Sequence, residues 1–238
     1  MRLQGQTALV TGGSRGIGRA VALALAREGA ALVLVARGAA GLEVAAGELE
    51  AMGAVALPVA ADLSEEAGAS RAVEAALDRF GRLDLLVTAQ GTGTFGPVET
   101  SRLPDWEAMM AANLRATYLA CRAALPPMLE AGRGTIVNVI SLAALRPIPG
   151  CAAYTASKAG ALGFTRVLAE EVRGRGLRVA AVCPGAVDTP FWDAIANPPD
   201  RTRMLRPESV ADTVLLIATQ PPEAMVEEVV LAPTPGVL

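Results

Sequence analysis

Short apolar runs alternate with longer, alanine-rich segments of helical period along the whole chain. The apolar runs are rich in Val, Leu and Ala and have the length of buried strands. Strands are predicted at Thr7–Thr11, Ala31–Ala36, Val55–Ala60, Leu83–Thr88, Thr135–Ile140, Arg178–Cys183 and Glu228–Leu231. Helices are predicted at Gly16–Glu28, Ala40–Met52, Glu65–Phe80, Trp106–Ala131, Ala152–Arg173 and Pro207–Thr219.

This alternation predicts an α/β protein: a Rossmann-like three-layer fold with a parallel sheet of about seven strands and helices on both faces. Strands buried on both faces should be apolar throughout. Ala31–Ala36 fits this expectation, and so does Leu83–Val87 apart from Asp84. A chain of 238 residues suits one domain, which we expect to span residues 1–238.

The long irregular stretch of the chain is Gly185–Arg206, which holds three prolines beside Phe191 and Trp192. A loop of this length inside a compact domain is usually functional. We interpret it as a substrate loop that is mobile alone and closes over the ligands. A wall that is permanently packed is the alternative.

Composition narrows the function classes. The formal net charge is −3, so no overall positive field attracts nucleic acid or an anionic membrane. Charged residues, Gly or Pro interrupt every apolar run before the roughly 18 residues that span a bilayer. The chain has no histidine, and its three cysteines lack CxxC spacing. We therefore expect a cytoplasmic protein with reduced thiols, no metal, no nucleic-acid or membrane partner, and acid–base chemistry that does not use imidazole.

A glycine-rich turn joins the first predicted strand to the first predicted helix. It reads Thr11-Gly12-Gly13-Ser14-Arg15-Gly16-Ile17-Gly18. Glycines at 12, 16 and 18 permit a sharp turn, close approach to a pyrophosphate and tight helix packing, with the helix N-terminus facing the negative charge. The turn lacks the Lys of a nucleotide-triphosphate loop, so a dinucleotide is favoured over ATP. A glycine-rich turn without a ligand is the alternative.

The end of the second strand bears on the choice of dinucleotide. An acidic residue there would bind a ribose 2′-hydroxyl, but the chain reads Val35-Ala36-Arg37. Arg37 and Arg15 are suited to clamp a 2′-phosphate, which favours NADP(H) over NAD(H), unless Arg37 is simply a solvated residue. Asp62, after the third strand, is expected either to accept from the adenine amino group or to cap the next helix.

Candidate acid–base chemistry lies in the second half of the chain. Tyr154 and Lys158 are four residues apart, which places both on one face of a helix. A nearby ammonium favours the tyrosinate, so we expect a lowered Tyr154 pKa and a role as acid or base. Ser141 follows a predicted strand at the edge where ligands bind in open α/β folds.

These residues together carry a family resemblance. Gly12, Gly16, Gly18, Asp62, Asn113, Ser141, Tyr154, Lys158 and Pro184-Gly185 occur in the order and approximate spacing of the short-chain dehydrogenase/reductase family, which the chain resembles from about residue 5 onward. The resemblance implies a Ser–Tyr–Lys–Asn site. Tyr154 would give or take the proton, and Ser141 would hold the carbonyl oxygen. Lys158 would bind the nicotinamide ribose and depress the Tyr154 pKa, while Asn113 would anchor a water that relays protons.

The cofactor-binding residues that we expect are Gly12, Ser14, Arg15, Gly16, Ile17, Gly18, Arg37, Asp62, Leu63, Gly91, Tyr154, Lys158, Pro184, Gly185, Val187 and Thr189. By the resemblance, Pro184, Gly185 and Thr189 border the nicotinamide. The chain departs from the family's usual Asn-Asn-Ala-Gly after the fourth strand, where it reads Thr88-Ala89-Gln90-Gly91. Gln90 is expected to place a longer amide beside the adenine ribose. The C-terminal segment also lacks the Asp-Gly-Gly ending frequent in the family.

These features predict an NAD(P)-dependent oxidoreductase that transfers a hydride between NADP(H) and a small carbonyl or alcohol substrate. The alternatives are a catalytically silent dinucleotide-binding regulatory protein, an NAD-linked alcohol dehydrogenase, and an isomerase or dehydratase that uses the cofactor transiently. Phe95, Phe191, Trp192 and Leu145–Cys151 indicate an apolar or mixed pocket. The family resemblance makes 3-oxoacyl thioesters one candidate substrate class and implies a homodimer or homotetramer. The alanine-rich segments Ala108–Ala131 and Ala152–Ala169 suit close helix packing.

Overall fold

The computed structural model describes residues 1–236 as an α/β fold built on a seven-stranded sheet. The strands are β1 (Thr7–Thr11), β2 (Ala31–Ala36), β3 (Ala56–Ala60), β4 (Leu85–Thr88), β5 (Gly134–Val139), β6 (Leu177–Pro184) and β7 (Glu228–Leu231). They lie in the order β3-β2-β1-β4-β5-β6-β7, and all neighbours are parallel. The predicted Rossmann-like parallel sheet is confirmed. The last two positions of the domain predicted for 1–238 lie outside the described residues.

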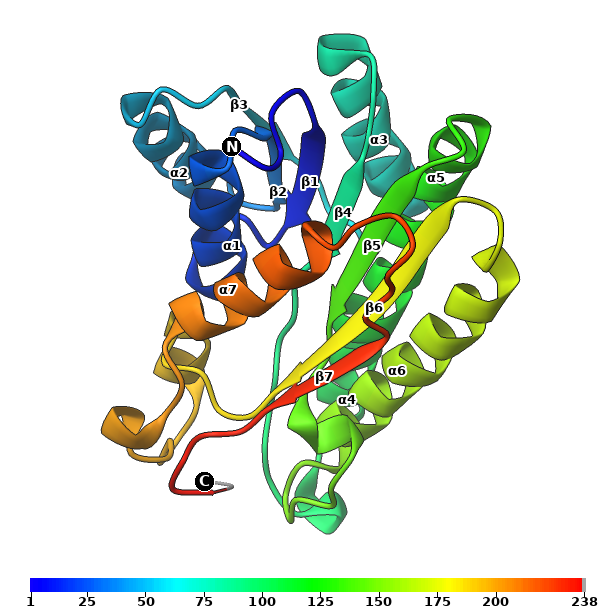
Figure 1. The fold of residues 1–238 in the computed structure, drawn as a ribbon. Coiled ribbons are helices and arrows are strands. Elements are labelled where there is room, and N and C mark those ends of the chain that lie inside the picture. Colours follow the sequence, from blue (N-terminus) through cyan, green and yellow to red (C-terminus); the bar gives the residue numbers. More distant parts are fainter. Residues whose placement is uncertain (237–238) are drawn as a thin grey trace.

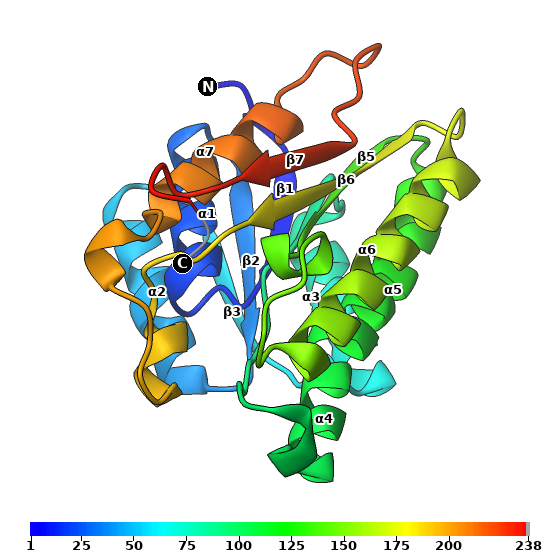
Figure 2. The same ribbon diagram turned by 90° about the horizontal axis from the view of Figure 1, so that it is seen from below.

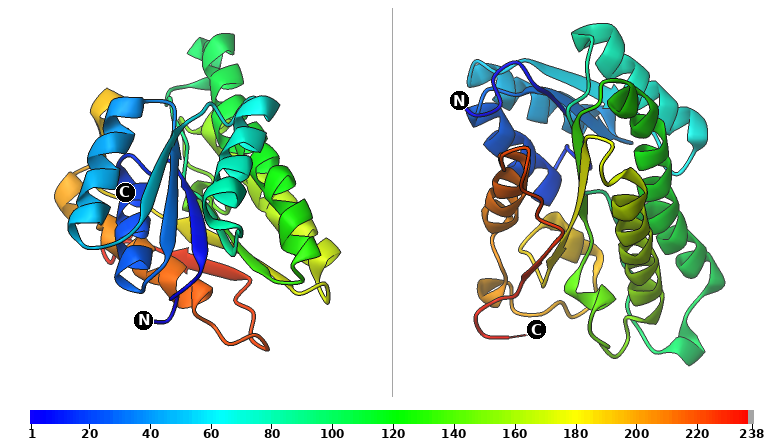
Figure 3. Two further views of the ribbon diagram at one scale, coloured as in Figure 1. Left: turned by 90° about the horizontal axis from the view of Figure 1, so that it is seen from above. Right: turned by 45° about the vertical axis from the view of Figure 1, so that its right-hand side comes forward.

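Helices cover both faces of the sheet (Figures 1 and 3). α1 (Gly16–Arg27), α2 (Ala39–Ala51) and α7 (Pro207–Ala218) cover one face, and α3 (Glu66–Phe80), α5 (Ala116–Glu130) and α6 (Ala152–Val172) cover the other. From β1 the chain first adds β2 and β3 on one side and then β4 on the other. The loops after β1 and β4 therefore run in opposite directions and leave a crevice at the carboxyl edge of the sheet.

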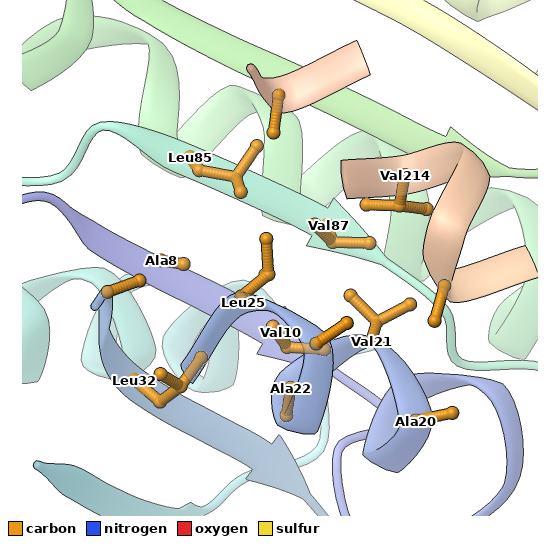
Figure 4. Close-up of a cluster of buried hydrophobic side chains, with 14 of the residues drawn as sticks. Ala8, Val10, Ala20, Val21, Ala22, Leu25, Leu32, Leu85, Val87 and Val214 are labelled. Atoms are coloured by element: carbon orange, nitrogen blue, oxygen red, sulfur yellow. The ribbon is translucent and has the colours of Figure 1, made fainter. Parts of the chain in front are cut away.

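The core between the sheet and its first helix is made of small apolar side chains. In Figure 4, Val21 and Leu25 of α1 lie among Val10 of β1, Val87 of β4 and Val214 of α7. All five are completely buried, and burying a Val or Leu side chain contributes about 1.5–3 kcal/mol each. The alanines that fill most of the remaining buried positions of α1 let the helix approach the strands closely.

The helix predicted for Trp106–Ala131 is wrong as a single regular helix. α4 (Leu103–Met109) begins earlier, with a proline in its first turn, and a π-helical segment, η2 (Met110–Arg115), separates it from α5. A π turn holds one more residue than an α turn, so it rotates the side chains that follow, and it often marks a functional site. The apolar pattern runs through all three segments, which is why it predicted one helix.

Asp84, the polar residue predicted inside a buried strand, lies immediately before β4 instead. Its carboxylate accepts a hydrogen bond from the Thr7 backbone N–H at 2.9 Å and another from the Arg82 guanidinium at 2.6 Å. Its exposure is 8%, and a carboxylate that is this buried needs such partners. Asp84 therefore joins the starts of β1 and β4 rather than breaking the sheet.

The segment after β6 lies at the carboxyl edge of the sheet (Figures 1 and 2). As predicted for 185–206 it is largely irregular, with two short 3-10 turns, η4 (Pro190–Ala194) and η5 (Arg201–Arg203). Its ends pair with each other: the Asp188 N–H donates to the Leu205 carbonyl at 2.8 Å, and the Leu205 N–H donates to the Ala186 carbonyl at 2.9 Å. The base of this substrate loop is thus fixed by backbone pairing. Among residues 1–236, no helix combines the length and apolar character that a membrane crossing requires.

Candidate active site

A cavity of about 910 Å³ opens at the carboxyl edge of the sheet. Its walls come from the connections that follow β1 to β6 and from the start of α6. The predicted site residues that line it are Gly12, Ser14, Arg15, Gly16, Ile17, Arg37, Asp62, Leu63, Gly91, Ser141, Tyr154, Lys158, Pro184, Gly185, Val187 and Thr189. Gly18 and Asn113 are the predicted site residues outside this described lining. A cavity of this size, lined by segments far apart in the sequence, suits a cofactor together with a small molecule.

The glycine-rich turn after β1 is shaped by close backbone contacts. Gly12 has φ +65°, and a Cβ there would lie 2.9 Å from the Ala89 carbonyl oxygen. A Cβ at Gly18 would lie 2.3 Å from the Gly12 carbonyl oxygen, so any larger residue would push α1 away from the turn. No side chain caps the N-terminus of α1. Gly16 and Ile17 of its first turn line the cavity, and an uncapped helix N-terminus is a common place for phosphate to bind.

Two arginines lie at the end of the cavity that is formed by the connections after β1 and β2. Arg15 and Arg37 are exposed and line this end, next to Asp62. The Asp62 carboxylate accepts from the Ser64 hydroxyl at 2.7 Å and the Ser64 N–H at 2.9 Å, and these bonds lower its pKa, with a smaller effect from Arg37. The capping alternative for Asp62 is wrong, because α3 begins at Glu66 and its N-cap residue is Glu65. Asp62 instead fixes the turn that leads into α3.

Tyr154 lies in the first turn of α6, with its ring partly buried in the cavity wall. Burial raises the pKa of the Tyr154 phenol to about 12, while a hydrogen bond with the Ser141 side chain acts in the opposite direction. The predicted lowering of the Tyr154 pKa by Lys158 is therefore wrong for this structure. Sharing a helix face does not bring the ammonium close enough to outweigh the desolvation of the phenol. Tyr154 is protonated at neutral pH.

Ser141 follows β5 and begins a short 3-10 turn, η3 (Leu142–Ala144). Its hydroxyl oxygen accepts a hydrogen bond from the Ala143 N–H at 3.1 Å. This contact fixes the Ser141 side chain, which also bonds the Tyr154 phenol. Ser141 and Tyr154 therefore both contribute a hydroxyl group to the cavity wall, and the role of Ser141 in holding a carbonyl oxygen stays a prediction.

Lys158 is the only lysine of the chain, and it is 5% exposed. Its ammonium donates to the Val139 carbonyl at 3.1 Å. Burial lowers the pKa of the Lys158 amine to about 8. At neutral pH the amine is still largely protonated, so a positive charge lies in the cavity wall close to the Tyr154 side of the site.

Asn113 lies in the π-helical segment η2 and is completely buried. Its side-chain oxygen accepts from the Thr92 N–H at 2.9 Å, and its side-chain nitrogen donates to the Thr92 carbonyl and to the Ser157 hydroxyl, each at 2.9 Å. The Ser157 hydroxyl in turn donates to the Tyr154 carbonyl at 2.8 Å. Asn113 therefore connects the loop after β4 to the helix that carries Tyr154. Thr92 and Ser157 were not predicted as site residues, because their partners are distant in sequence.

Gln90 makes contacts that sequence reasoning missed. Its side-chain oxygen accepts from the Thr11 hydroxyl, and its side-chain nitrogen donates to the Thr117 hydroxyl at 3.1 Å. The Thr117 hydroxyl donates to the Asn113 carbonyl at 2.9 Å. Both ends of the Gln90 amide are thus bound within the protein, and a hydrogen-bonded series runs from the end of β1 to the π-helical segment. The departure from the family's usual motif at position 90 was the available signal.

Arg201 is a further residue that no sequence pattern indicated. Its guanidinium binds the Asp188 carboxylate at 2.5 Å, the Asp193 carboxylate at 2.8 Å and the Thr189 carbonyl at 3.2 Å. These contacts join the second half of the substrate loop to its first half. Thr189 packs against the glycine-rich turn, 3.3 Å from the position of a Cβ at Gly16. Arg201 therefore holds the loop against the predicted phosphate end of the cavity.

Comparison with known proteins agrees with this geometry. Residues 6–199 match the family model of the short chain dehydrogenases. The chain is 37% identical over 227 residues to a D-threitol dehydrogenase of Mycolicibacterium smegmatis, covering 92% of this chain and 87% of that protein. It is 36% identical over 230 residues to a 3-oxoacyl-[acyl-carrier-protein] reductase of Synechocystis sp., covering 94% and 93%. A solved structure of a metagenomic short-chain oxidoreductase in complex with NADP matches with a TM-score of 0.87 and 40% identity, covering 98% of this chain and 100% of that one.

The comparisons and the structure agree over nearly the whole chain. The glycine-rich turn and the cavity lie at the carboxyl edge of a parallel sheet, and the relatives are named as dehydrogenases and reductases. This chain therefore belongs to the short-chain dehydrogenase family and is an NAD(P)-dependent oxidoreductase.

Proposed function

We propose that this oxidoreductase transfers a hydride between NADP(H) and a carbonyl or alcohol substrate, with Tyr154 as the general acid and base. The observation that carries the proposal is that the Tyr154 phenol, bonded to Ser141, shares one cavity with the glycine-rich turn. The names of two relatives, a D-threitol dehydrogenase and a 3-oxoacyl-[acyl-carrier-protein] reductase, describe alcohol and carbonyl substrates.

In the direction of reduction, a reduced nicotinamide bound in this cavity would supply the hydride for the carbonyl carbon. Tyr154 gives its proton to the carbonyl oxygen as the carbon–oxygen double bond becomes single, and Ser141 donates a hydrogen bond to the same oxygen. A phenol that is protonated at neutral pH is suited to this step. Lys158 would hold the ribose hydroxyls, and the Tyr154 proton would return from solvent by way of Lys158 and a water bound at Asn113. In oxidation the same groups act in reverse.

A cofactor fits the residues present. The Gly12 and Gly18 positions leave no room for a Cβ, and the uncapped start of α1 faces the place where a pyrophosphate would bind. We assign the adenosine end to Arg15, Arg37, Asp62 and Leu63, and the nicotinamide end to Pro184, Gly185, Val187 and Thr189, all of which line the cavity. The two arginines support NADP(H) as the preferred cofactor, and a solved relative in complex with NADP agrees with it.

The decisive experiment follows NADPH consumption with a panel of carbonyl compounds. Tyr154→Phe should lose about 10²- to 10⁴-fold in turnover and keep its cofactor affinity, because the transferable proton alone is removed. Tyr118→Phe is the matched control, because it removes the hydroxyl of the other tyrosine, keeps the ring on α5 and lies outside the cavity lining. Wild-type turnover in Tyr154→Phe would contradict the mechanism. Tight NADPH binding without turnover of any carbonyl or alcohol would favour the catalytically silent alternative.

The cofactor preference has its own test. Arg37→Ala should weaken NADPH binding by about 1.5–3 kcal/mol, or roughly 10- to 150-fold, and leave NADH binding unchanged, because the 2′-phosphate loses a charge-assisted partner. Arg175→Ala, at an exposed position outside the cavity, is the control. Equal affinity of the wild-type protein for NADPH and NADH at low salt would favour the NAD-linked alternative.

We also propose a cytoplasmic homodimer or homotetramer. The support for an oligomer is the exposure of large side chains on adjacent helices, with Tyr118 of α5 43% exposed and Val167 of α6 59% exposed. The support for the cytoplasm is that Cys121 and Cys183 are buried free thiols.

A further inference from the structure

Four aromatic rings meet at the end of the cavity that holds Tyr154. The Phe95 and Phe191 rings lie 5.6 and 6.0 Å from the Tyr154 ring, measured between centroids. The Trp192 ring lies 5.9 Å from the Phe95 ring and 5.3 Å from the Phe191 ring. The two loops that supply these rings, after β4 and after β6, therefore meet beside the Tyr154 ring.

The positions of the loop rings are fixed by polar contacts at the base of the loop. The Trp192 indole N–H donates to the Val187 carbonyl at 2.9 Å, and the Thr189 hydroxyl oxygen accepts from the Phe191 N–H at 3.4 Å. Gly93 faces the rings from the opposite loop, and a Cβ there would lie 2.5 Å from the tip of the Phe191 ring. The aromatic cluster is thus a built feature of the cavity wall.

Of the charged residues that the structure places in the cavity wall, Lys158 alone lies on the Tyr154 side. Among the described residues that line it, the charged ones are Arg15, Arg37, Asp62 and Lys158. The first three are at the adenosine end, and the Lys158 ammonium is bound to the Val139 carbonyl. Around the rings the lining continues with Ile148, Cys151 and Ile195. A charged substrate group at this end would find one ionic partner at most, the Lys158 ammonium that already binds the Val139 carbonyl, so its loss of water remains costly.

We propose that the substrate is an uncharged carbonyl compound with a planar, apolar group next to the carbonyl, such as an aryl ketone, and that Phe95, Phe191 and Trp192 select it. This inference rests on the proposed function, because it specifies the substrate of the same hydride transfer. A substrate that reaches Tyr154 must replace contacts between rings. A flat aromatic group restores edge and face contacts of the same kind, whereas a saturated or polar group of equal size does not.

The test compares three ketones of similar size: acetophenone, cyclohexyl methyl ketone, which has the same carbon skeleton without the flat ring, and phenylglyoxylate, which carries a carboxylate on the carbonyl carbon. With NADPH, kcat/KM should be about tenfold higher for acetophenone than for cyclohexyl methyl ketone, which corresponds to two or three aromatic contacts. Phenylglyoxylate should react at least about 100-fold more slowly than acetophenone. A ratio of one or below between the first two ketones would overturn the inference.

Variants assign the preference to the rings. Phe191→Leu and Phe95→Leu keep an apolar side chain and should reduce the ratio between acetophenone and cyclohexyl methyl ketone towards one. Phe80→Leu, at the end of α3 and outside the cavity, should leave the ratio unchanged. An unchanged ratio in both Phe191→Leu and Phe95→Leu would show that these rings do not select the substrate.

A binding measurement separates this inference from the hydride-transfer proposal. Trp106→Phe leaves Trp192 as the only tryptophan, so quenching of its fluorescence reports binding at the aromatic cluster. In the presence of NADP⁺, which cannot reduce a ketone, acetophenone should quench with a lower Kd than cyclohexyl methyl ketone. Selective binding without turnover would refute the hydride-transfer proposal and keep the selectivity. Turnover of ketones with no preference for aryl groups in rate or binding would keep the hydride-transfer proposal and refute the selectivity.

Discussion

Replacement of Lys158 by methionine should make the protein more stable at neutral pH. The side chain is buried, and its pKa falls from the ordinary 10.5 to about 8 because burial disfavours the charged form. Methionine has a similar length and no charge. The lost function of Lys158 and the gained stability of the fold should therefore appear in the same variant.

The magnitude follows from the gap between the two pKa values of Lys158. The folded protein holds the proton less tightly than the unfolded chain, so the unfolded chain binds more protons between pH 8 and 10.5. The free energy of unfolding therefore rises with pH in that window, and below it the buried charge costs the fold about 3 kcal/mol. Methionine also loses the hydrogen bond to the Val139 carbonyl, worth about 1 kcal/mol. Lys158→Met should thus gain about 2 kcal/mol at pH 7 and about nothing at pH 10.

The measurement is urea unfolding of the protein without cofactor at pH 7 and pH 10, at one protein concentration so that oligomerisation contributes equally. Arg175→Met, which removes one exposed charge, serves as the control. Because Lys158 is the only lysine, selective ¹⁵N labelling of lysine gives one side-chain amine signal, which should titrate near pH 8. A signal that titrates above pH 10, or a variant that is less stable than the wild type at pH 7, would refute this reasoning.

Three further predictions concern the contacts around the site. Gln90→Ala should lower the free energy of unfolding by about 1–2 kcal/mol, because the Thr11 and Thr117 hydroxyls lose a partner. Urea unfolding of this variant is compared with that of Gln220→Ala, which loses one surface hydrogen bond. An equal loss of stability in the two variants would contradict the prediction. Hydrogen exchange across Asp188–Arg203 should slow when NADPH and a substrate analogue bind. It should be faster in Arg201→Ala than in Arg203→Ala, because Arg201 binds two carboxylates of the loop. Equal protection in all forms would mean that the loop is permanently packed. Light scattering should give the mass of a dimer or tetramer, and Tyr118→Glu should shift it towards the monomer; a wild-type protein that is monomeric at every concentration would refute the oligomer.

The strands and the glycine-rich turn could be predicted because their signals are local. Val33 and Val35 are completely buried in the middle of the sheet, so the β2 run is apolar on both faces and has clear ends. Gly18 is required by a contact with Gly12 inside the same strand–turn–helix unit, and Gly12 has a positive φ that its own turn requires. For the β2 strand and the glycine-rich turn, the residues that determine the structure are close together in the sequence.

The π-helical segment and the state of Tyr154 could not be predicted in this way. The side chain of Asn113 is fixed by Thr92, 21 positions earlier, and by Ser157, 44 positions later, while the apolar pattern of its own helix is unchanged. The spacing of Tyr154 and Lys158 correctly indicated a shared face. It carried no information about the burial of the phenol, which depends on rings at positions 95 and 191 that the fold brings together.

Gly91 leaves space for two parts of the site that are costly to fold, a buried charge and a π-helical segment. The buried Lys158 ammonium and the π-helical segment around Asn113 both face this residue: a Cβ at Gly91 would lie 3.0 Å from the Asn113 side-chain oxygen and 3.6 Å from the Lys158 nitrogen. A Cβ at position 91 would be tight against the Asn113 side-chain oxygen and would push on the hydrogen bonds between Asn113 and Thr92. The three preceding positions, Thr88, Ala89 and Gln90, depart from the family pattern. Thr88 and Gln90 hydrogen-bond to Asn138 and Thr117, so their side chains have partners inside the protein, whereas the contact with Asn113 favours a residue without a side chain at position 91.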